Sequence, residues 1–324
     1  MTPDSRAPEA APPEPPTPAR SGTVALAGRS NVGKSTLLNA LLGEELSVVA
    51  PTPQTTRDAI LGIVYHRDAQ IGVLDTPGLH KPRTHLGKRM NAEARAAVND
   101  ADLVVFVADP VERAGGELAV HEGDRTLLAD VGAGKPTVLA LNKIDRVRPR
   151  SRLLPLLEEF AKVRDFAAFV PISARRRDGL GRLLDEVAAR LPERPPLFPP
   201  DELSDRPLRF FAAEFVREQI LRATRDELPY VVAVTVDSFT DAPSGAKIAA
   251  TIHVEREGQK GILVGKGGAK LRDIGTAARE KIGRFLDRPA HLSLFVRVDP
   301  GWSDDPRALV DLGYGSRRDG GGSK

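Results

Sequence analysis

The chain has 324 residues, of which 41% are hydrophobic and 28% charged, so it is long enough for two globular domains with separate cores. It contains no cysteine, which excludes disulfides and thiolate metal sites, and its net charge is only +3. No apolar run approaches the roughly 20 residues of a membrane span, and the N-terminus lacks the order of a signal peptide. A cytoplasmic protein is therefore expected.

Residues 1–20 are mostly Pro, Ala, Glu and Thr, a composition that predicts a disordered tail. From residue 21 to 192, short Val-, Ile- and Leu-rich runs alternate with longer segments of helical period. This alternation predicts an α/β domain in which helices wrap a parallel-rich sheet. The runs expected to be strands are VALAG, IGVLD, LVVFVAD, TVLALN and FVPIS.

A stiff linker is expected at residues 193–207, because the stretch from Leu191 to Pro207 contains six prolines. The pattern of residues 208–315 then predicts the order helix, strand, strand, helix, helix, strand, with two short helices meeting at a glycine turn. The end of the chain, residues 316–324, is rich in Gly and Ser and is expected to be flexible.

The sequence GRSNVGKST, residues 28–36, directly follows an apolar strand and precedes an apolar helix. Its spacing of Gly, four residues and Gly-Lys-Ser is typical of a loop whose backbone N–H groups wrap a phosphate chain at a helix N-terminus. In that context Lys34 would reach the β- and γ-phosphates, and Ser35 would bind Mg²⁺. The nucleotide-binding residues expected here are Gly28, Asn31, Gly33, Lys34, Ser35 and Thr36.

The sequence LNKID, at the end of a later apolar strand, indicates which base is bound. The Asp145 carboxylate can accept hydrogen bonds from guanine N1–H and the exocyclic amine, whereas adenine has an acceptor at N1. By itself the motif would equally fit a solvated turn, but its distance of about 110 residues from a phosphate loop favours base binding. The base pocket is expected to contain Asn142, Lys143, Asp145, Ser173 and Ala174.

Between these motifs lie residues suited to sensing a third phosphate. Asp75, in LDTPGLH, can hold Mg²⁺ through water, and the N–H of Gly78 can meet the γ-phosphate. Thr56, in PQTTRD, offers a hydroxyl ligand to the same ion. The order of the motifs predicts a GTPase. The expected metal ligands are Ser35, Thr56 and, through water, Asp75, and the expected catalytic residues are Asn31, Lys34, Thr56 and Gly78.

A second glycine-lysine turn, GKGG at residues 265–268, lies between the two predicted helices of the C-terminal region. A Gly-x-x-Gly turn in this helix and strand order is the KH arrangement, which clamps the backbone of single-stranded RNA. The stretch from Lys260 to Arg288 holds eight Lys or Arg and only three Asp or Glu, which also suits a polyanion, although alone it would fit a solvated helix face. The expected RNA-binding residues are Ile262, Val264, Gly265, Lys266, Gly267, Gly268 and Lys270.

Taken together, the chain resembles the bacterial Era family of GTPases, in which a P-loop domain precedes a type II KH domain of the α+β class. The resemblance runs from about residue 23 to 314 and departs at Ser30, where the family usually has proline. It implies GTP and GDP as ligands with Mg²⁺, and the 3′ end region of 16S rRNA and the 30S subunit as partners. It also implies a monomer with possible peripheral contact with the inner membrane. The motifs that carry it are GRSNVGKS, PQTTRD, DTPGLHKP, NKID, DRPLRFFAAEFVREQI, RDELPY, GQKGILVGKGGAKLRDIG and GWSDD.

Leu79 stands at the position where Ras-like enzymes have a glutamine that orients the attacking water. A leucine side chain has neither donor nor acceptor, so another group must meet the developing charge. Asn31 can help to hold a monovalent cation against the phosphates, and GTPases with a similar GRxNxGKS loop use potassium in this way. The alternative is that Asn31 only stabilises the turn.

Two other functions fit parts of the sequence. A tRNA-modifying enzyme or a ribosome factor with two GTPase domains would share the PxxTTRD-like and DTPG motifs, but only one Gly-Lys-Ser loop is present. In a non-catalytic scaffold, nucleotide would only hold the fold, and the KH-like region would bind protein. Turnover of GTP distinguishes the scaffold from a switch enzyme.

Overall fold

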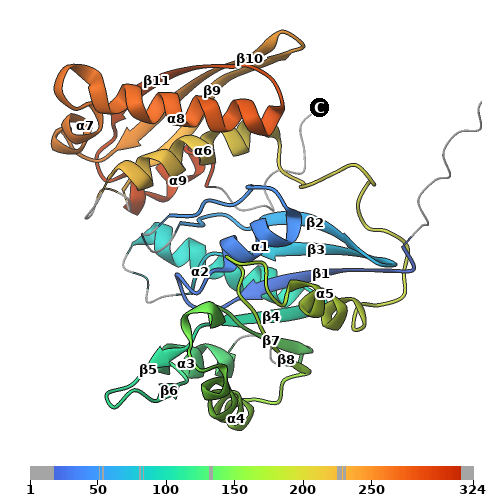
Figure 1. Ribbon diagram of the computed structural model, residues 1–324. Helices are drawn as coiled ribbons and strands as arrows, with labels where there is room; N and C mark the ends of the chain where they lie inside the picture. Colours follow the sequence, from blue (N-terminus) through green and yellow to red (C-terminus); the bar gives the residue numbers. More distant parts are fainter. Residues whose placement is uncertain are drawn as a thin grey trace, which may run out of the picture.

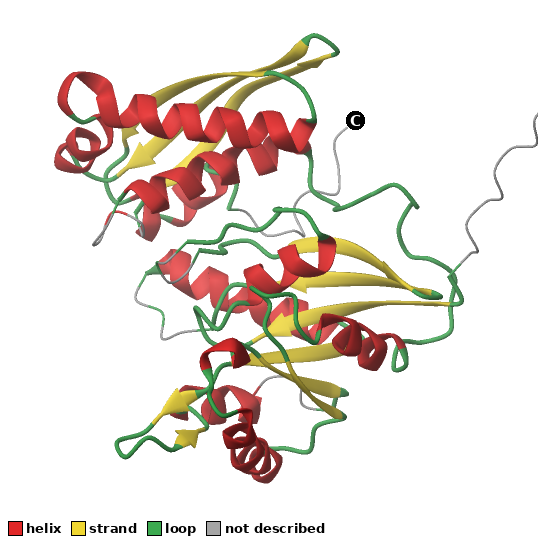
Figure 2. Cartoon of the chain, in the orientation of Figure 1, coloured by secondary structure: helices red, strands yellow, loops and turns green. Residues whose placement is uncertain are grey.

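A computed structural model describes two bodies joined by the proline-rich segment (Figures 1 and 2). The predicted tail at 316–324, most of the tail at 1–20, most of RDELPY, and parts of PQTTRD and DTPGLHKP lie outside the described residues. None of the described helices combines the length and apolar composition that crossing a bilayer requires. The structure describes residues 18–50, 52, 55–79, 82, 84–130, 134–224, 228 and 231–314.

The first body contains a six-stranded sheet in the order β2-β3-β1-β4-β7-β8. The five predicted strands are present and parallel, as expected for an α/β domain. The edge strand β2, which pairs antiparallel with β3, is not among the predicted strands. The strands are β1 (Arg20–Ala27), β2 (Ile60–His66), β3 (Ala69–Asp75), β4 (Leu103–Ala108), β7 (Thr137–Leu141) and β8 (Ala168–Pro171), with a small hairpin of β5 (Val111–Glu112) and β6 (Leu118–Ala119) beside them.

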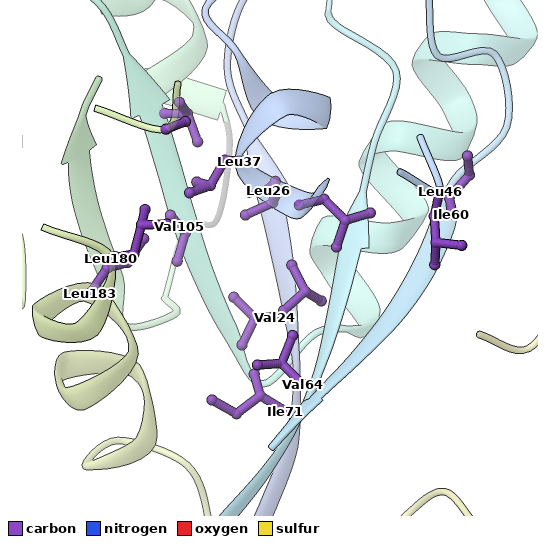
Figure 3. Packing of buried hydrophobic residues seen from close by; sticks show 14 of the residues in the cluster. Val24, Leu26, Leu37, Leu46, Ile60, Val64, Ile71, Val105, Leu180 and Leu183 are labelled. Carbon is purple, nitrogen blue, oxygen red and sulfur yellow. The ribbon is translucent and has the colours of Figure 1, made fainter. Parts of the chain in front are cut away.

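Helices cover both faces of this sheet, because alternate residues of each strand point to opposite faces. Val24 and Leu26 of β1 pack with the helices on one face (Figure 3), and Ala25 and Ala27 pack with those on the other. The helices of the first face are α1 (Lys34–Leu42) and α5 (Leu180–Ala188), and those of the second are α2 (His85–Asp100), α3 (Glu122–Asp130) and α4 (Leu153–Val163). Because the five strands are parallel, their carboxyl ends lie at one edge of the sheet. The loops that contain the predicted nucleotide-binding motifs are at this edge.

The segment 193–207, all of it described, contains no helix and no strand, apart from a single bridge between Glu193 and Arg20. It does not hang free between the bodies. The side chain of Gln70 donates to the carbonyl of Phe198 at 2.7 Å, and the Phe198 ring packs against Leu61, Ile63 and Leu74 of the sheet. The linker is thus fastened along the first body.

The second body has the predicted order of elements around a three-stranded sheet, β11-β10-β9. The helix after the glycine turn is not short, as the sequence pattern predicts, but has 18 residues, because its apolar positions continue to pack against α6 and β11. The elements are α6 (Leu208–Ala223), β9 (Ala233–Ala242), β10 (Gly245–Val254), α7 (Glu257–Val264), α8 (Ala269–Leu286), β11 (Ala290–Val298), η5 (Trp302–Asp304) and α9 (Pro306–Asp311).

The two bodies meet through a buried apolar cluster. Leu86 and Met90 of α2 pack with Trp302 and Tyr314, whose rings stack at 6.0 Å between centroids. Figure 1 shows α9 lying over the end of the first body at which α2 begins. The second body is therefore packed against the first, close to the edge where the motif loops lie.

Candidate nucleotide and RNA sites

The phosphate loop joins β1 to α1 and needs glycine at both ends. Gly28 has a φ of 145°, and a Cβ there would lie 2.3 Å from the carbonyl oxygen of Val107. Gly33 has a φ of 102°, and a Cβ there would lie 2.4 Å from Nδ2 of Asn142. Any side chain at either position would push the loop away from the sheet, so both predicted glycines are required by close approach as well as by φ.

Lys34 begins α1, and its side chain curls back over the loop. Its Nζ donates to the carbonyl oxygens of Gly28 at 3.0 Å and Arg29 at 2.9 Å. Burial lowers the pKa of Lys34 to about 8, although the nearby Asp75 carboxylate opposes this shift. Among the described residues, this buried cation is held by two neutral carbonyls, so it is well prepared to bind phosphate oxygens.

The three predicted metal ligands converge below the loop. The hydroxyls of Ser35 and Thr56 are 2.8 Å apart, and the Thr56 hydroxyl donates to Oδ2 of Asp75 at 3.1 Å. The other oxygen of Asp75 is buried and has no partner among the described residues, and burial raises the pKa of this carboxyl. Two hydroxyls and a carboxylate oxygen with an unmet bonding capacity fit Mg²⁺, which prefers oxygen ligands.

A cavity of about 300 Å³ opens beside these groups, and Asn31, Thr36 and Gly78 are among the residues that line it, whereas Gly28 is not. A Cβ on Gly78 would lie 2.5 Å from the Ser30 hydroxyl, so only glycine lets this segment pass the phosphate loop. Leu79, by contrast, packs against the apolar cluster on the α2 face of the sheet and does not line the cavity. Its position is consistent with the prediction that it does not orient water.

The base-pocket residues form a second set of contacts. Asn142 holds the phosphate loop to the rest of the site, because its Nδ2 donates to the Val32 carbonyl at 2.8 Å and its Oδ1 accepts from the Ala174 N–H at 2.9 Å. Asp145 accepts from the Ser173 hydroxyl at 2.6 Å, and this bond lowers the pKa of Asp145. The carboxylate therefore stays an ionised acceptor, as guanine binding requires.

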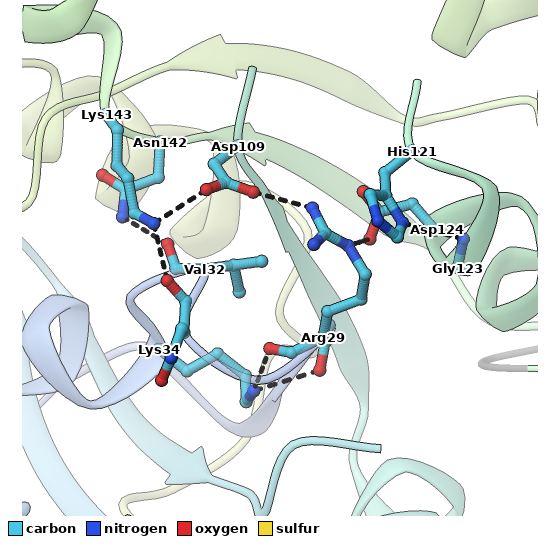
Figure 4. Close-up of polar contacts among 11 residues, drawn as sticks. Arg29, Val32, Lys34, Asp109, His121, Gly123, Asp124, Asn142 and Lys143 are labelled. Carbon is cyan, nitrogen blue, oxygen red and sulfur yellow. Dashed lines mark hydrogen bonds and ion pairs between the residues drawn. The ribbon is translucent and has the colours of Figure 1, made fainter. Parts of the chain in front are cut away.

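Lys143 belongs to a charged network that the motifs do not predict (Figure 4). Its Nζ donates to the Asn31 carbonyl at 2.6 Å and to Asp109 at 2.7 Å. Asp109 also accepts from Arg29 at 2.7 Å, and Arg29 donates from Nε to the buried Asp124 at 2.8 Å. No spacing rule links these residues, since the sheet order alone brings them together. The network ties the base motif to the phosphate loop.

The second glycine turn has three glycines of positive φ in four residues. Gly265, Gly267 and Gly268 have φ values of 70°, 59° and 76°. A Cβ on Gly265 would lie 2.8 Å from Cβ of Lys270, whereas a Cβ on Gly267 or Gly268 would meet nothing within 4 Å. Lys266 is exposed on the same turn. The turn is thus open to a phosphate backbone and has cationic side chains beside it.

Of the apolar residues predicted to support bases, Ile262 is 53% exposed and Val264 is half-buried. The structure adds a groove of about 350 Å³ that leads away from the turn between α8 and β11. Arg272 and Arg279 line this groove and were not among the predicted RNA-binding residues, although their spacing of seven residues in a helix places them on a shared face. The groove is lined by Gly268, Leu271, Arg272, Gly275, Thr276, Arg279, Leu292 and Leu294.

Comparison with known families assigns both bodies. The model described as 50S ribosome-binding GTPase matches residues 23–143. The model described as KH domain matches residues 227–303. The second body is therefore a KH domain, which contradicts the alternative of a second GTPase domain and confirms the order of domains predicted from the motifs.

Similar proteins match nearly the whole chain. GTPase Era of Stenotrophomonas maltophilia strain K279a is 46% identical over 301 residues, which cover 92% of this chain and 98% of that protein. GTPase Era of Geobacter metallireducens is 45% identical over 302 residues, with the same coverage of 92% and 98%.

Solved structures give the same result. A variant of Aquifex aeolicus Era bound to GDP and AlF₄⁻ superposes with a TM-score of 0.87 at 37% identity, covering 92% of this chain and 100% of that one. Era in complex with MgGDPNP and nucleotides 1506–1542 of 16S ribosomal RNA superposes with a TM-score of 0.85 at 36% identity, covering 92% and 99%.

Proposed function

Because this chain belongs to the Era family of GTPases, we propose that it binds 16S ribosomal RNA through its KH domain, in a manner set by GTP, and assists assembly of the 30S subunit. The chain is a GTPase, and the scaffold alternative without catalysis is wrong. The observation that carries the RNA proposal is the exposed glycine turn with its adjoining basic groove, which has the chemistry to hold a single strand.

The choice of ribosomal subunit rests on how much of the chain each similarity covers. The matching family model names the 50S ribosome but spans only part of the first domain. The relative in complex with a 16S fragment covers 92% of this chain, including the KH domain. We therefore favour small-subunit RNA. A monomeric state and a peripheral contact with the inner membrane remain predictions from the resemblance.

For hydrolysis, we propose that guanine nucleotide and Mg²⁺ bind in the cavity described above. A bound Mg²⁺ would neutralise charge on the β- and γ-phosphates. Ser35, Thr56 and Asp75 would hold it, Asp75 through water, while Lys34 meets the phosphate oxygens and the Gly78 N–H meets the third phosphate. Asp145 would accept from the guanine edge.

The RNA site is tested by reversing charge in the glycine turn. The double variant Lys266→Asp, Gly267→Asp places two carboxylates against the RNA backbone, and we expect its affinity for the 16S 3′-end fragment to fall by about a hundredfold or more. Filter binding at one stated salt concentration measures it, because the affinity depends on counterion release. GTP binding should be unchanged.

The control is Lys247→Asp, the same lysine-to-aspartate change without the second carboxylate, at an exposed lysine of β10 outside the turn. It should bind RNA nearly as well as the unmodified protein. Equal losses in the turn variant and in this control would show a general charge effect, and the assignment of the turn would then be wrong.

Potassium activation is a separate proposal that rests on Asn31 and Leu79. Asn31 lines the cavity and Leu79 is packed away from it, so we propose that a monovalent cation held with the help of Asn31 meets charge in the transition state together with Lys34 and Mg²⁺. We expect GTP hydrolysis to be several-fold faster in K⁺ than in Na⁺ at equal ionic strength. Steady-state phosphate release in the two salts measures this ratio.

Variants at Asn31 have to be chosen with its backbone conformation in mind, because its φ is 63°. Asn31→Ala would add strain, since alanine rarely adopts that conformation, whereas Asn31→Gly removes the amide and keeps the loop relaxed. Both should lose the potassium advantage. Equal rates in the two salts for the unmodified protein would disprove the role, and a preserved advantage in Asn31→Gly would assign the cation to other groups.

A further inference from the structure

The KH domain contacts two segments of the nucleotide-binding domain close to the phosphate site, namely the segment between α1 and β2 and the start of α2. Lys281 of α8 donates to Glu45, in the segment between α1 and β2, at 2.7 Å. At the start of α2, the backbone N–H of His85 donates to Asp304 at 2.9 Å. The first of these segments contains the predicted metal ligand Thr56, so the domain contact and the nucleotide site share a stretch of chain.

One contact holds the residue before Thr56. Arg217, on α6 of the KH domain, donates through Nη2 to the backbone carbonyl of Thr55. The same guanidinium is fixed by two parallel bonds to Glu214, and its side chain is only 1% exposed. Burial favours the neutral form, but the Glu214 carboxylate outweighs it and raises the pKa of Arg217, so the group stays charged. A buried, bidentate arginine is a rigid donor.

A second contact holds the residue after Thr56. Arg57 is 3% exposed and reaches into the KH domain, where its Nη1 donates to the Val232 carbonyl at 2.6 Å and to the Tyr314 hydroxyl at 3.2 Å. Its guanidinium also lies 5.8 Å from the ring centroids of Trp302 and Tyr314. Stacking on two aromatic rings adds cation–π attraction to the hydrogen bonds.

We propose that Arg57 and Arg217 are positioning residues for GTP hydrolysis, through which the KH domain holds Thr56 in line with Ser35 and Asp75. With the chain anchored on both sides, the Thr56 hydroxyl keeps its place without the entropy cost of ordering a loose segment. The coupling is reciprocal: any ligand that orders Thr56 also favours domain contact. The proposal rests on the GTPase activity and does not depend on RNA binding.

The test uses the full-length protein, without RNA, and the variants Arg217→Lys and Arg57→Lys. Lysine keeps the charge but cannot make the paired bonds of a guanidinium. We expect kcat for GTP to fall about tenfold, as for the loss of a charged hydrogen bond, and the affinity for GDP to change by less than about twofold. Amide hydrogen exchange should become faster at residues 55–58 and remain unchanged in β1.

The matched control is Arg222→Lys, on the same helix. Arg222 also reaches the nucleotide-binding domain, donating to the Val49 carbonyl at 3.3 Å, but its side chain is 48% exposed and the residue that it contacts is farther from Thr56 along the chain than Thr55 is. Its kcat should match that of the unmodified protein. If Arg217→Lys fails to fold, Tyr314→Phe removes only the hydroxyl that accepts from Arg57, and a smaller change in the same direction is expected.

Three results would overturn the proposal. The first is faster exchange at residues 55–58 with unchanged kcat, which would show that the contacts hold the two domains together without affecting hydrolysis. The second is a lower kcat with unchanged local exchange. The third is a loss of kcat in the control equal to that in the positioning variants. A failure of RNA binding would leave all these measurements unaffected, so the two proposals can fail independently.

Discussion

Replacing Asp145 by asparagine is expected to shift nucleotide preference from GTP toward xanthosine triphosphate by about a thousandfold or more, because a site built around one donor and acceptor pattern rejects the other strongly. In Asp145→Asn, the retained Oδ1 can still accept from Ser173 and from N1–H of the base. The new Nδ2 donor faces the position where guanine has an amine and xanthine an oxygen. Competition binding with labelled nucleotides measures the ratio.

Asp178→Asn is the control for this change. Asp178 lies five residues after Ser173, but its carboxylate pairs with Arg150 at 2.8 Å. The same chemical substitution there should leave GTP preferred. If Asp145→Asn kept the full preference for GTP, the base pocket would have to lie elsewhere.

Loss of the Lys34 charge is expected to reduce GTP hydrolysis by about a thousandfold, as for other preorganised groups that meet developing charge. In Lys34→Ala, the charged group that donates to the Gly28 and Arg29 carbonyls is removed, and the buried Asp75 loses the opposing charge of Lys34. Single-turnover phosphate release at saturating GTP measures the chemical step without the contribution of product release.

Leu79→Ala provides the comparison within the same motif region. Its side chain packs in the apolar cluster on the α2 face, so the substitution should lower stability while the rate per folded molecule changes by less than about threefold. A rate in Lys34→Ala within tenfold of the unmodified protein would contradict the assignment of the phosphate loop. A rate in Leu79→Ala as low as that of Lys34→Ala would give Leu79 a role that its chemistry does not explain.

Local patterns were sufficient to predict the order of elements and to place most of the expected nucleotide-binding residues at one edge of the sheet. GRSNVGKS, LDTPG and NKID each lie within a few residues of a strand end, and parallel strands bring those ends to one edge. The edge strand β2 was missed because its seven residues, ILGIVYH, contain a glycine and lack alternation between apolar and polar positions.

Contacts between distant residues could not be predicted. Arg29, Asp109 and Lys143 meet only because β1, β4 and β7 are neighbours in the sheet, and each charge alone fits an exposed loop equally well. Arg217 likewise has the pattern of a solvated helix residue, although it is 1% exposed against the other domain. The charge of a residue does not identify the residue that it pairs with until the topology is known.

The fastened linker limits how far the KH domain can travel. A free chain of this length would span about 50 Å when extended, at about 3.3 Å per residue. Here the Ser21 hydroxyl donates to the Pro195 carbonyl at 2.6 Å, and the Ile63 N–H donates to the Leu203 carbonyl at 3.0 Å, so little free chain precedes α6. A short tether keeps the local concentration of one domain near the other in the millimolar range. Docking is then favoured even when each contact is individually weak, and a ligand that binds either contact surface must outcompete this high local concentration before the domains undock.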